Sequence, residues 1–223
     1  MTNEAPPAPQ HKKPRGFLFY VAVTLGSLAL ASFLMASLLV LYVRAKVIFY
    51  TGTVATALPQ VSMPAADSDA VMKRIETFRS DLEQSKETPE LVLSADDINA
   101  FIAAKSTADK PFKDMLHVSL EGDKLGGQVS LPLDKTKLPL PSGRHLNGTG
   151  TLNVSMENGV LLITADTVTL NGKPLPDRLM AALRNENMAR DAYRRPKTAE
   201  MLRKIESIKI KDGRIAIKPR VNR

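Results

Sequence analysis

The sequence predicts an α+β fold, in which a single N-terminal transmembrane helix precedes an antiparallel β-sheet of hairpins packed against helices. Three observations lead to this fold class. A run without any charged residue extends from Phe17 to Val43. Three later segments alternate apolar and polar residues on both sides of a turn. Helical patterns precede the first of these segments and separate the second from the third.

The charge-free run is long enough to cross a bilayer. A membrane core requires about 20 apolar residues in a helix, whereas the apolar part of a cleavable signal peptide usually has about 7–15. We therefore interpret residues 16–43 as an uncleaved transmembrane helix, with a signal peptide as the alternative. Three Lys/Arg residues precede the run and two follow it, which favours a cytoplasmic N-terminus.

The remaining chain divides by composition. Residues 1–15 are short and proline-rich, so we expect a disordered cytoplasmic tail. Residues 44–66 form a connector whose apolar start, "VIFYTGTVATA", fits either a short strand or the end of the membrane helix. Residues 67–223 then form an extracytoplasmic α+β domain. Its first element is an amphipathic helix at 67–87, with one apolar stripe that includes Val71, Phe78 and Leu82.

Alternation predicts three β-hairpins. They cover residues 115–133, 145–170 and 208–219, with turns at "EGDK", Asn158-Gly159 and Asp212-Gly213. In the third hairpin Ile208 and Ile210 are expected to pair with Ile217 and Ile215. The glycines of "LGG" at 125–127 predict a bulge in the first hairpin.

Helices are expected on one side of this sheet. After a turn at Asn171-Gly172, Pro176 fits the first turn of a helix that is interrupted by Pro196. Residues 198–205 then predict a last short helix.

The acids in "LSADDINAFIA" predict a helix start and no catalytic pair. Ser94 ends a short strand and can act as an N-cap, with Asp97 at the capping-box position. Asp96 and Asp97 diverge on a helix, whereas an acid–base pair must converge on one reacting group. Asn99 lies at the edge of the apolar face, where its amide can bind the backbone of a neighbouring strand. Ser94, Asp97 and Asn99 are therefore predicted to have structural roles.

Other chemistry is scarce in the sequence. There is no cysteine, which excludes thiolate catalysis and thiolate metal sites. His117 and His145 have no third metal ligand at a recognisable spacing, so we expect surface histidines and no metal. No serine elbow or phosphate-binding glycine run is present, so we expect neither an enzyme nor a cofactor.

The C-terminal part of the chain is basic. Residues 177–223 carry fourteen Lys/Arg against six Asp/Glu. An extracytoplasmic position makes nucleic acid an unsuitable partner. Acids are interspersed, which favours a solvated helical face. The alternative is contact with anionic lipid headgroups. The residues that would make this contact are Arg184, Arg190, Arg194, Arg195 and Lys197.

The order of these parts resembles the YpmS-like single-pass bacterial membrane proteins of unknown function. It is also loosely similar to lipid-binding domains of the TULIP-like type. The resemblance covers roughly residues 90–219 and rests on Asp97-Ile98-Asn99 and on the turn from Gly172 to Pro176. The connection at 132–148 departs from the pattern because it is longer. The resemblance implies a curved sheet wrapped on a helix, with an apolar groove, and implies no activity.

Two functions remain open on the sequence. The first is a membrane-anchored, non-enzymatic extracytoplasmic domain that binds a lipid, another apolar ligand or a partner protein of the envelope. The alternative is a structural scaffold that joins a membrane complex through helix 67–87 and through small residues of the membrane segment. An apolar cavity or surface open to solvent would favour the first.

Overall fold

The computed structural model describes residues 17–134, 141–157 and 159–220, with the side chains of residues 17–26 and 157 excepted. The predicted tail at 1–15 lies outside these residues. The chain divides into two units, Met1–Val47 and Ile48–Arg223, and each is described by itself. The predicted α+β class is confirmed, because a long apolar helix is followed by antiparallel sheets packed with helices.

The first unit consists of most of helix α1, Phe17–Tyr50. Within the described part of the chain, Ser27–Tyr50 is the one helical segment long and apolar enough to cross a membrane, a property that signal sequences share. The last turn of α1 belongs to the second unit. The apolar start of the connector is therefore helical as far as Tyr50, which decides between the two alternatives given by the sequence.

The second unit contains two antiparallel sheets, where the sequence predicted one. The first has the order β1-β8-β7, with strands Leu91–Ser94, Arg214–Pro219 and Ile205–Lys211. The second has the order β2-β3-β4-β5-β6, with strands Leu116–Glu121, Lys124–Pro132, His145–Glu157, Val160–Leu170 and Lys173–Pro174. The third hairpin pairs with β1 and not with the other two hairpins, so a second sheet forms.

The three predicted hairpins are present. In the third, Ile208 pairs with Ile217 and Ile210 with Ile215, as the alternation predicts. Its turn residues Asp212 and Gly213 both have positive φ, 52° and 69°, which a tight hairpin turn requires. The prediction of a bulge at 125–127 is wrong.

Strand β3 stays in register with both neighbours at Gly126 and Gly127, and the irregularity lies instead between Thr151 and Leu152 of β4. Packing explains the glycine at position 126, since an added Cβ would lie 2.1 Å from the Ser119 Oγ.

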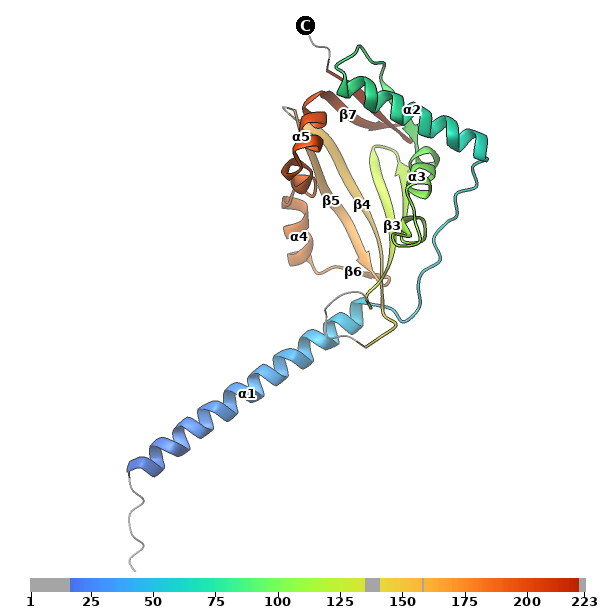
Figure 1. The fold of residues 1–223 in the computed structure, drawn as a ribbon. Helices are drawn as coiled ribbons and strands as arrows, with labels where there is room; N and C mark the ends of the chain where they lie inside the picture. Colours follow the sequence, from blue (N-terminus) through green and yellow to red (C-terminus); the bar gives the residue numbers. More distant parts are fainter. Residues whose placement is uncertain (1–16, 135–140, 158, 221–223) are drawn as a thin grey trace, which may run out of the picture. The chain divides into compact units, whose positions relative to one another are not determined.

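Helices lie beside and across the larger sheet. Figure 1 shows α3 and α4 at its two sides, and α2 with β7 across one end. The helices are α2 (Ala65–Glu83), α3 (Ala95–Ala104), α4 (Asp177–Asn185) and α5 (Pro196–Arg203), with short 3₁₀ turns at Phe112–Asp114 and Arg190–Arg194.

Two helix predictions need correction. The helix expected to run from Pro176 towards Pro196 ends at Asn185, because the next residues bind the edge of β5. Pro176 is the N-cap and Pro196 is the first residue of α5, so Pro196 begins a helix and does not interrupt one.

The main core lies between α2, α5 and the smaller sheet. Phe78 and Leu82 of α2 meet Leu91 and Leu93 of β1, and Leu202 of α5 completes this side with Ile205 and Ile208 of β7. Only one end of the larger sheet reaches this core, through the partly buried Val154, Met156 and Leu161. Most of the larger sheet therefore lies outside the main core.

Candidate functional site

The acidic stretch that follows β1 forms a helix cap. The Ser94 hydroxyl accepts a hydrogen bond from the Asp97 N–H at 3.1 Å, and the Asp97 carboxylate accepts one from the Ser94 N–H at 2.9 Å. These two bonds make a capping box. Asp97 also bonds Arg74 of α2 at 3.1 Å, whereas Asp96 is exposed. The two acids therefore do not face a common centre.

Asn99 binds the outer edge of β2. Its side chain is buried, and its amide nitrogen donates to the Val118 carbonyl at 2.7 Å. Its amide oxygen accepts from the Val118 N–H at 2.8 Å. The amide thus replaces one residue of a missing neighbouring strand, and it satisfies two backbone groups that would otherwise be buried without partners.

Asn187 does the same at the opposite edge of the sheet. Its amide oxygen accepts from the Ile163 N–H at 3.1 Å, and its nitrogen donates to the Leu161 carbonyl at 3.0 Å. The Met188 N–H donates to the Ile163 carbonyl, and the Tyr193 hydroxyl accepts from the Leu161 N–H. A side-chain amide therefore closes β2, and another closes β5 at residues 161–163, where β6 does not pair with it.

The five basic residues singled out from the sequence lie on consecutive elements, from α4 through the 3₁₀ turn at Arg190–Arg194 to α5. Arg190 and Arg194 pair with Glu186 and Asp191 of their own segment, and these side chains are largely exposed. The Arg184 guanidinium donates to the Asp166 carbonyl. Arg195 and Lys197 are exposed. Contact of these five residues with lipid headgroups stays a prediction.

The two histidines lie on different strands. His117 is on the polar face of β2, and the His145 backbone pairs with Gly52. The His145 Nδ1 is buried and has no hydrogen-bond partner in the described part of the protein. Among the described residues, no group of three or more acidic or histidine side chains is arranged to hold a metal ion.

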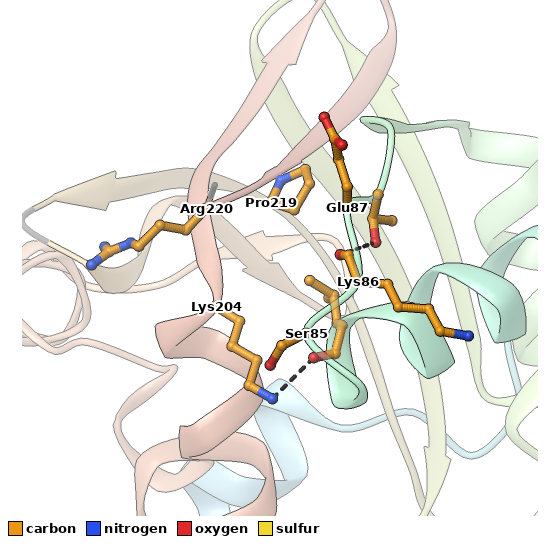
Figure 2. Close-up of a pocket in the computed structure, with 8 residues that line it drawn as sticks. Ser85, Lys86, Glu87, Lys204, Pro219 and Arg220 are labelled. Carbon is orange, nitrogen blue, oxygen red and sulfur yellow. Dashed lines mark hydrogen bonds between the residues drawn. The ribbon is translucent and has the colours of Figure 1, made fainter. Parts of the chain in front are cut away.

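Figure 2 shows a cavity of about 250 Å³ between the C-terminal end of α2 and the end of β8. The Lys204 ammonium bonds the carbonyls of Leu82 and Glu83, at 3.0 and 3.1 Å, and so caps α2. The charged ends of Lys86, Glu87 and Arg220 point away from one another. This cavity holds no convergent set of charged groups.

The larger sheet has one polar and one apolar face. Thr149, Thr151, Asn153 and Ser155 of β4 lie on the polar face, and cross-strand hydrogen bonds join Thr149 to Thr169 and Thr151 to Thr167. The other face carries a set of aliphatic side chains that we call the open apolar face. It consists of Leu116, Leu125, Val129, Leu131, Leu146, Leu152, Val168 and Leu170.

The open apolar face is only partly covered. Each of its eight side chains is half-buried, between the buried and exposed classes. α3 packs against β2, α4 and α5 against β5, and β7 against β4. No helix in the described part of the chain makes an extended contact with β3, and Figure 1 shows the middle of the sheet between α3 and α4.

Glycines form the middle of this face. Gly127 of β3 lies opposite Gly150 of β4, and Gly148 lies opposite Val129. A Cβ added at Gly127 would have no neighbour closer than the His117 carbonyl oxygen, 4.0 Å away. An added Cβ at Gly148 would lie 3.1 Å from the Leu170 and Val129 side chains, so of these glycines Gly127 is the one beside open space.

One end of the open apolar face adjoins the last turn of α1. Gly52 and His145 exchange backbone hydrogen bonds of 2.9 and 2.8 Å. Arg144, 8% exposed, donates to the Ile48 carbonyl at 2.7 Å and also binds the Thr51 carbonyl and hydroxyl. Lys173 binds the Phe49 carbonyl at 3.0 Å and lies over the Phe49 ring. Both cations are placed where a helix C-terminus favours positive charge.

An exposed ion pair crosses the polar face. The Lys124 ammonium lies 2.7 Å from the Asp166 carboxylate, which also accepts a hydrogen bond from Thr151. The hydrogen bond to Lys124 lowers the pKa of Asp166 below its ordinary value of 3.8. The same bond raises the pKa of Lys124. These shifts come from a mutual hydrogen bond and not from burial, and they give no sign of a catalytic group.

Comparison of the chain with protein-family models, with curated proteins and with solved structures finds no match.

Sequence reasoning missed the roles of Arg144 and Asn187 and the glycines of the open apolar face. Asn187 and Arg144 lie in irregular segments, where no periodicity shows which way a side chain points. Gly148 and Gly150 could have been found, because both fall at apolar positions of the alternating pattern and leave them empty.

Proposed function

We propose that this protein is a membrane-anchored, non-enzymatic domain that binds the hydrocarbon part of a lipid on its open apolar face. α1 would cross the membrane with the N-terminus in the cytoplasm, and the sheets would lie outside the cytoplasm. The observation that carries the proposal is the apolar sheet face, over whose centre no helix of the described residues makes an extended contact. The resemblance to TULIP-like domains seen in the sequence supports the same class of ligand.

The incomplete cover of an apolar sheet face needs an explanation. Antiparallel sheets commonly pack their apolar face on the core and leave the polar face in water. Here Thr149 and Asn153 of the polar face are exposed, whereas the connector buries Ser130 and Asn147 of the same face. Much of the apolar face is also left outside the main core. Contiguous exposed apolar surface marks sites of protein, membrane or ligand contact. A lipid chain would complete the packing that the described residues leave open.

The position of this face favours a lipid over a water-soluble ligand. Leu146 and Leu170 lie within two residues of Arg144 and Asn171, which bind the segment at 48–51. If α1 spans the membrane, this segment lies at the bilayer surface, and a hydrocarbon chain could pass from the bilayer to the sheet. Burying about eight methylene groups would contribute about 6 kcal/mol before the cost of ordering the chain.

The lipid proposal is tested by placing a charge on each face of the sheet. Gly127→Glu introduces a carboxylate into the open apolar face, at a position where a Cβ has open space. Asn153→Glu introduces the same group at an exposed position of the polar face. Native mass spectrometry of the full chain in detergent should show bound lipid for the natural chain and Asn153→Glu, and at least about tenfold less for Gly127→Glu, since a charge is excluded from hydrocarbon.

Equal lipid in both variants would contradict the proposal, because lipid around α1 alone is insensitive to either change. Melting temperatures of both variants control for loss of fold. Complexes with protein partners and no lipid would favour the scaffold function instead.

The proposed orientation has its own test, because the chain has no cysteine. A single cysteine introduced at the exposed Asp109 should react in intact cells with a membrane-impermeant maleimide. Reaction only after the cells are lysed would contradict the extracytoplasmic position.

A further inference from the structure

Strand β1 has a free edge. It is an outer strand of the smaller sheet and pairs with β8 on one side. Elsewhere in the described part of the chain, Asn99 binds the outer edge of β2, Asn187 binds β5 and β7 packs against β4. A free edge presents backbone groups to which another strand can be added.

The backbone of β1 shows which groups are free. The Ser94 N–H donates to Asp97 and not to β8, so Ser94 and its partner Arg214 form a pair without ladder hydrogen bonds. These pairs alternate along an antiparallel ladder. The N–H and C=O of Val92, two residues earlier, therefore also point away from β8. They face the side on which Arg74 of α2 bonds Asp97.

A groove lies between this edge and α2. It has a volume of about 570 Å³, and Ala70, Thr77 and Phe78 of α2 line one wall. Pro89 and Val92 line the other. Ala70 and Thr77, two turns apart on α2, are both exposed, so the groove is open along its length.

The two ends of the groove differ in charge. Lys73 and Arg74 line it near the end of β1 that is capped by Asp97. Asp81 and Glu90 line it near the loop that joins α2 to β1. Consider a strand that lies in the groove antiparallel to β1. Its charges would complement those of the groove if the strand had an acidic residue near its own N-terminus and a basic residue near its own C-terminus.

We propose that the groove between α2 and β1 binds an extended peptide segment of a partner protein by adding a strand to β1. The peptide backbone would bond the Val92 N–H and C=O, while small β-branched side chains fill the groove beside Phe78. A lipid chain fits this groove poorly, because it would leave these two backbone groups without partners. This proposal does not depend on lipid binding at the open apolar face.

Two synthetic peptides test the proposal. The first is acetyl-Glu-Thr-Val-Thr-Val-Thr-Lys-amide, and the second exchanges its terminal Glu and Lys. Fluorescence anisotropy with the full chain in lipid nanodiscs should show micromolar binding of the first peptide and at least tenfold weaker binding of the second. Methylation of the central backbone nitrogens should weaken the first peptide at least tenfold, because it removes the hydrogen bonds to β1.

Matched variants localise the binding. Thr77→Tyr fills the groove and should abolish binding, whereas Glu76→Tyr, one residue away and outside the groove, should not change it. Lys73→Glu cancels the positive charge at one end of the groove and should reduce the preference for the first peptide.

Melting temperatures confirm that each variant is folded, and Lys73→Glu is an exposed change that stays informative if Thr77→Tyr does not fold. Equal binding of the methylated peptide, or dissociation constants weaker than about 1 mM for both peptides, would overturn the proposal.

Discussion

Removal of the Asn99 amide should destabilise the second unit more than removal of the neighbouring acid. Asn99 is 3% exposed and bonds both backbone groups of Val118. In Asn99→Ala these groups lose their partners, and each buried unsatisfied group costs about 1–3 kcal/mol. Water that enters the space left by the amide would satisfy these two backbone groups in part. We therefore expect the free energy of unfolding to fall by about 3 kcal/mol. For a unit of this size the melting temperature should fall by about 6–12 °C.

Thermal unfolding of the full chain in detergent, followed by far-ultraviolet circular dichroism, measures this effect. Asp96→Ala is the matched control, because Asp96 is exposed on the same helix, and exposed substitutions usually change stability by less than about 0.5 kcal/mol. Equal losses for Asn99→Ala and Asp96→Ala would refute the role given to the Asn99 amide.

Asn99→Asp gives a further control. At neutral pH its buried carboxylate would face the Val118 carbonyl, so the pKa of the new group should be raised and the variant should be unstable. As the pH falls below the raised pKa, the protonated carboxyl can again donate to the Val118 carbonyl, and the difference in stability between the variant and the natural chain should shrink. A difference in stability that does not change with pH would contradict a hydrogen bond at this position.

Three further changes have defined outcomes. Asn187→Ala should cost about 1–2 kcal/mol and speed hydrogen exchange at the Ile163 amide; unchanged exchange would exclude its role at the edge of β5. Arg144→Met should cost about 2–4 kcal/mol and increase hydrogen exchange at residues 50–56, and unaltered protection there would contradict a link through Arg144. In the natural chain, the contribution of the Asp166–Lys124 pair is present above pH 3.8 and is lost as the pH falls through the lowered pKa of Asp166. The stability curves of Asp166→Asn and the natural chain should therefore converge in acid, and a constant separation would argue against the pair.

Local features of the fold followed from the sequence. The turn at Asp212-Gly213 requires positive φ, and the alternation around it determines the pairing of Ile208 with Ile217. The cap at Ser94 and the amide of Asn99 were predicted because both depend on spacing within one helix. These features need only the period of an element and the chemistry of its ends.

Long-range features did not follow. The pairing of β1 with β8 joins residues more than a hundred positions apart, and no local pattern indicates that β8 prefers β1 to the other hairpins. The helix expected to reach Pro196 ends earlier because Asn187 and Met188 bind β5, a contact between distant segments. The open apolar face could not be predicted either, since alternation shows that a face is apolar but not whether another element covers it.

Photo-cross-linking gives the most direct test of lipid binding by the sheet. The full chain is placed in nanodiscs that contain a phospholipid with a photoactivatable group at the end of one acyl chain, and adducts are mapped by mass spectrometry. The proposal predicts adducts on the open apolar face, at positions such as Val129, Leu152 and Leu170, which are lost in Gly127→Glu and retained in Asn153→Glu. Adducts confined to α1 would contradict it.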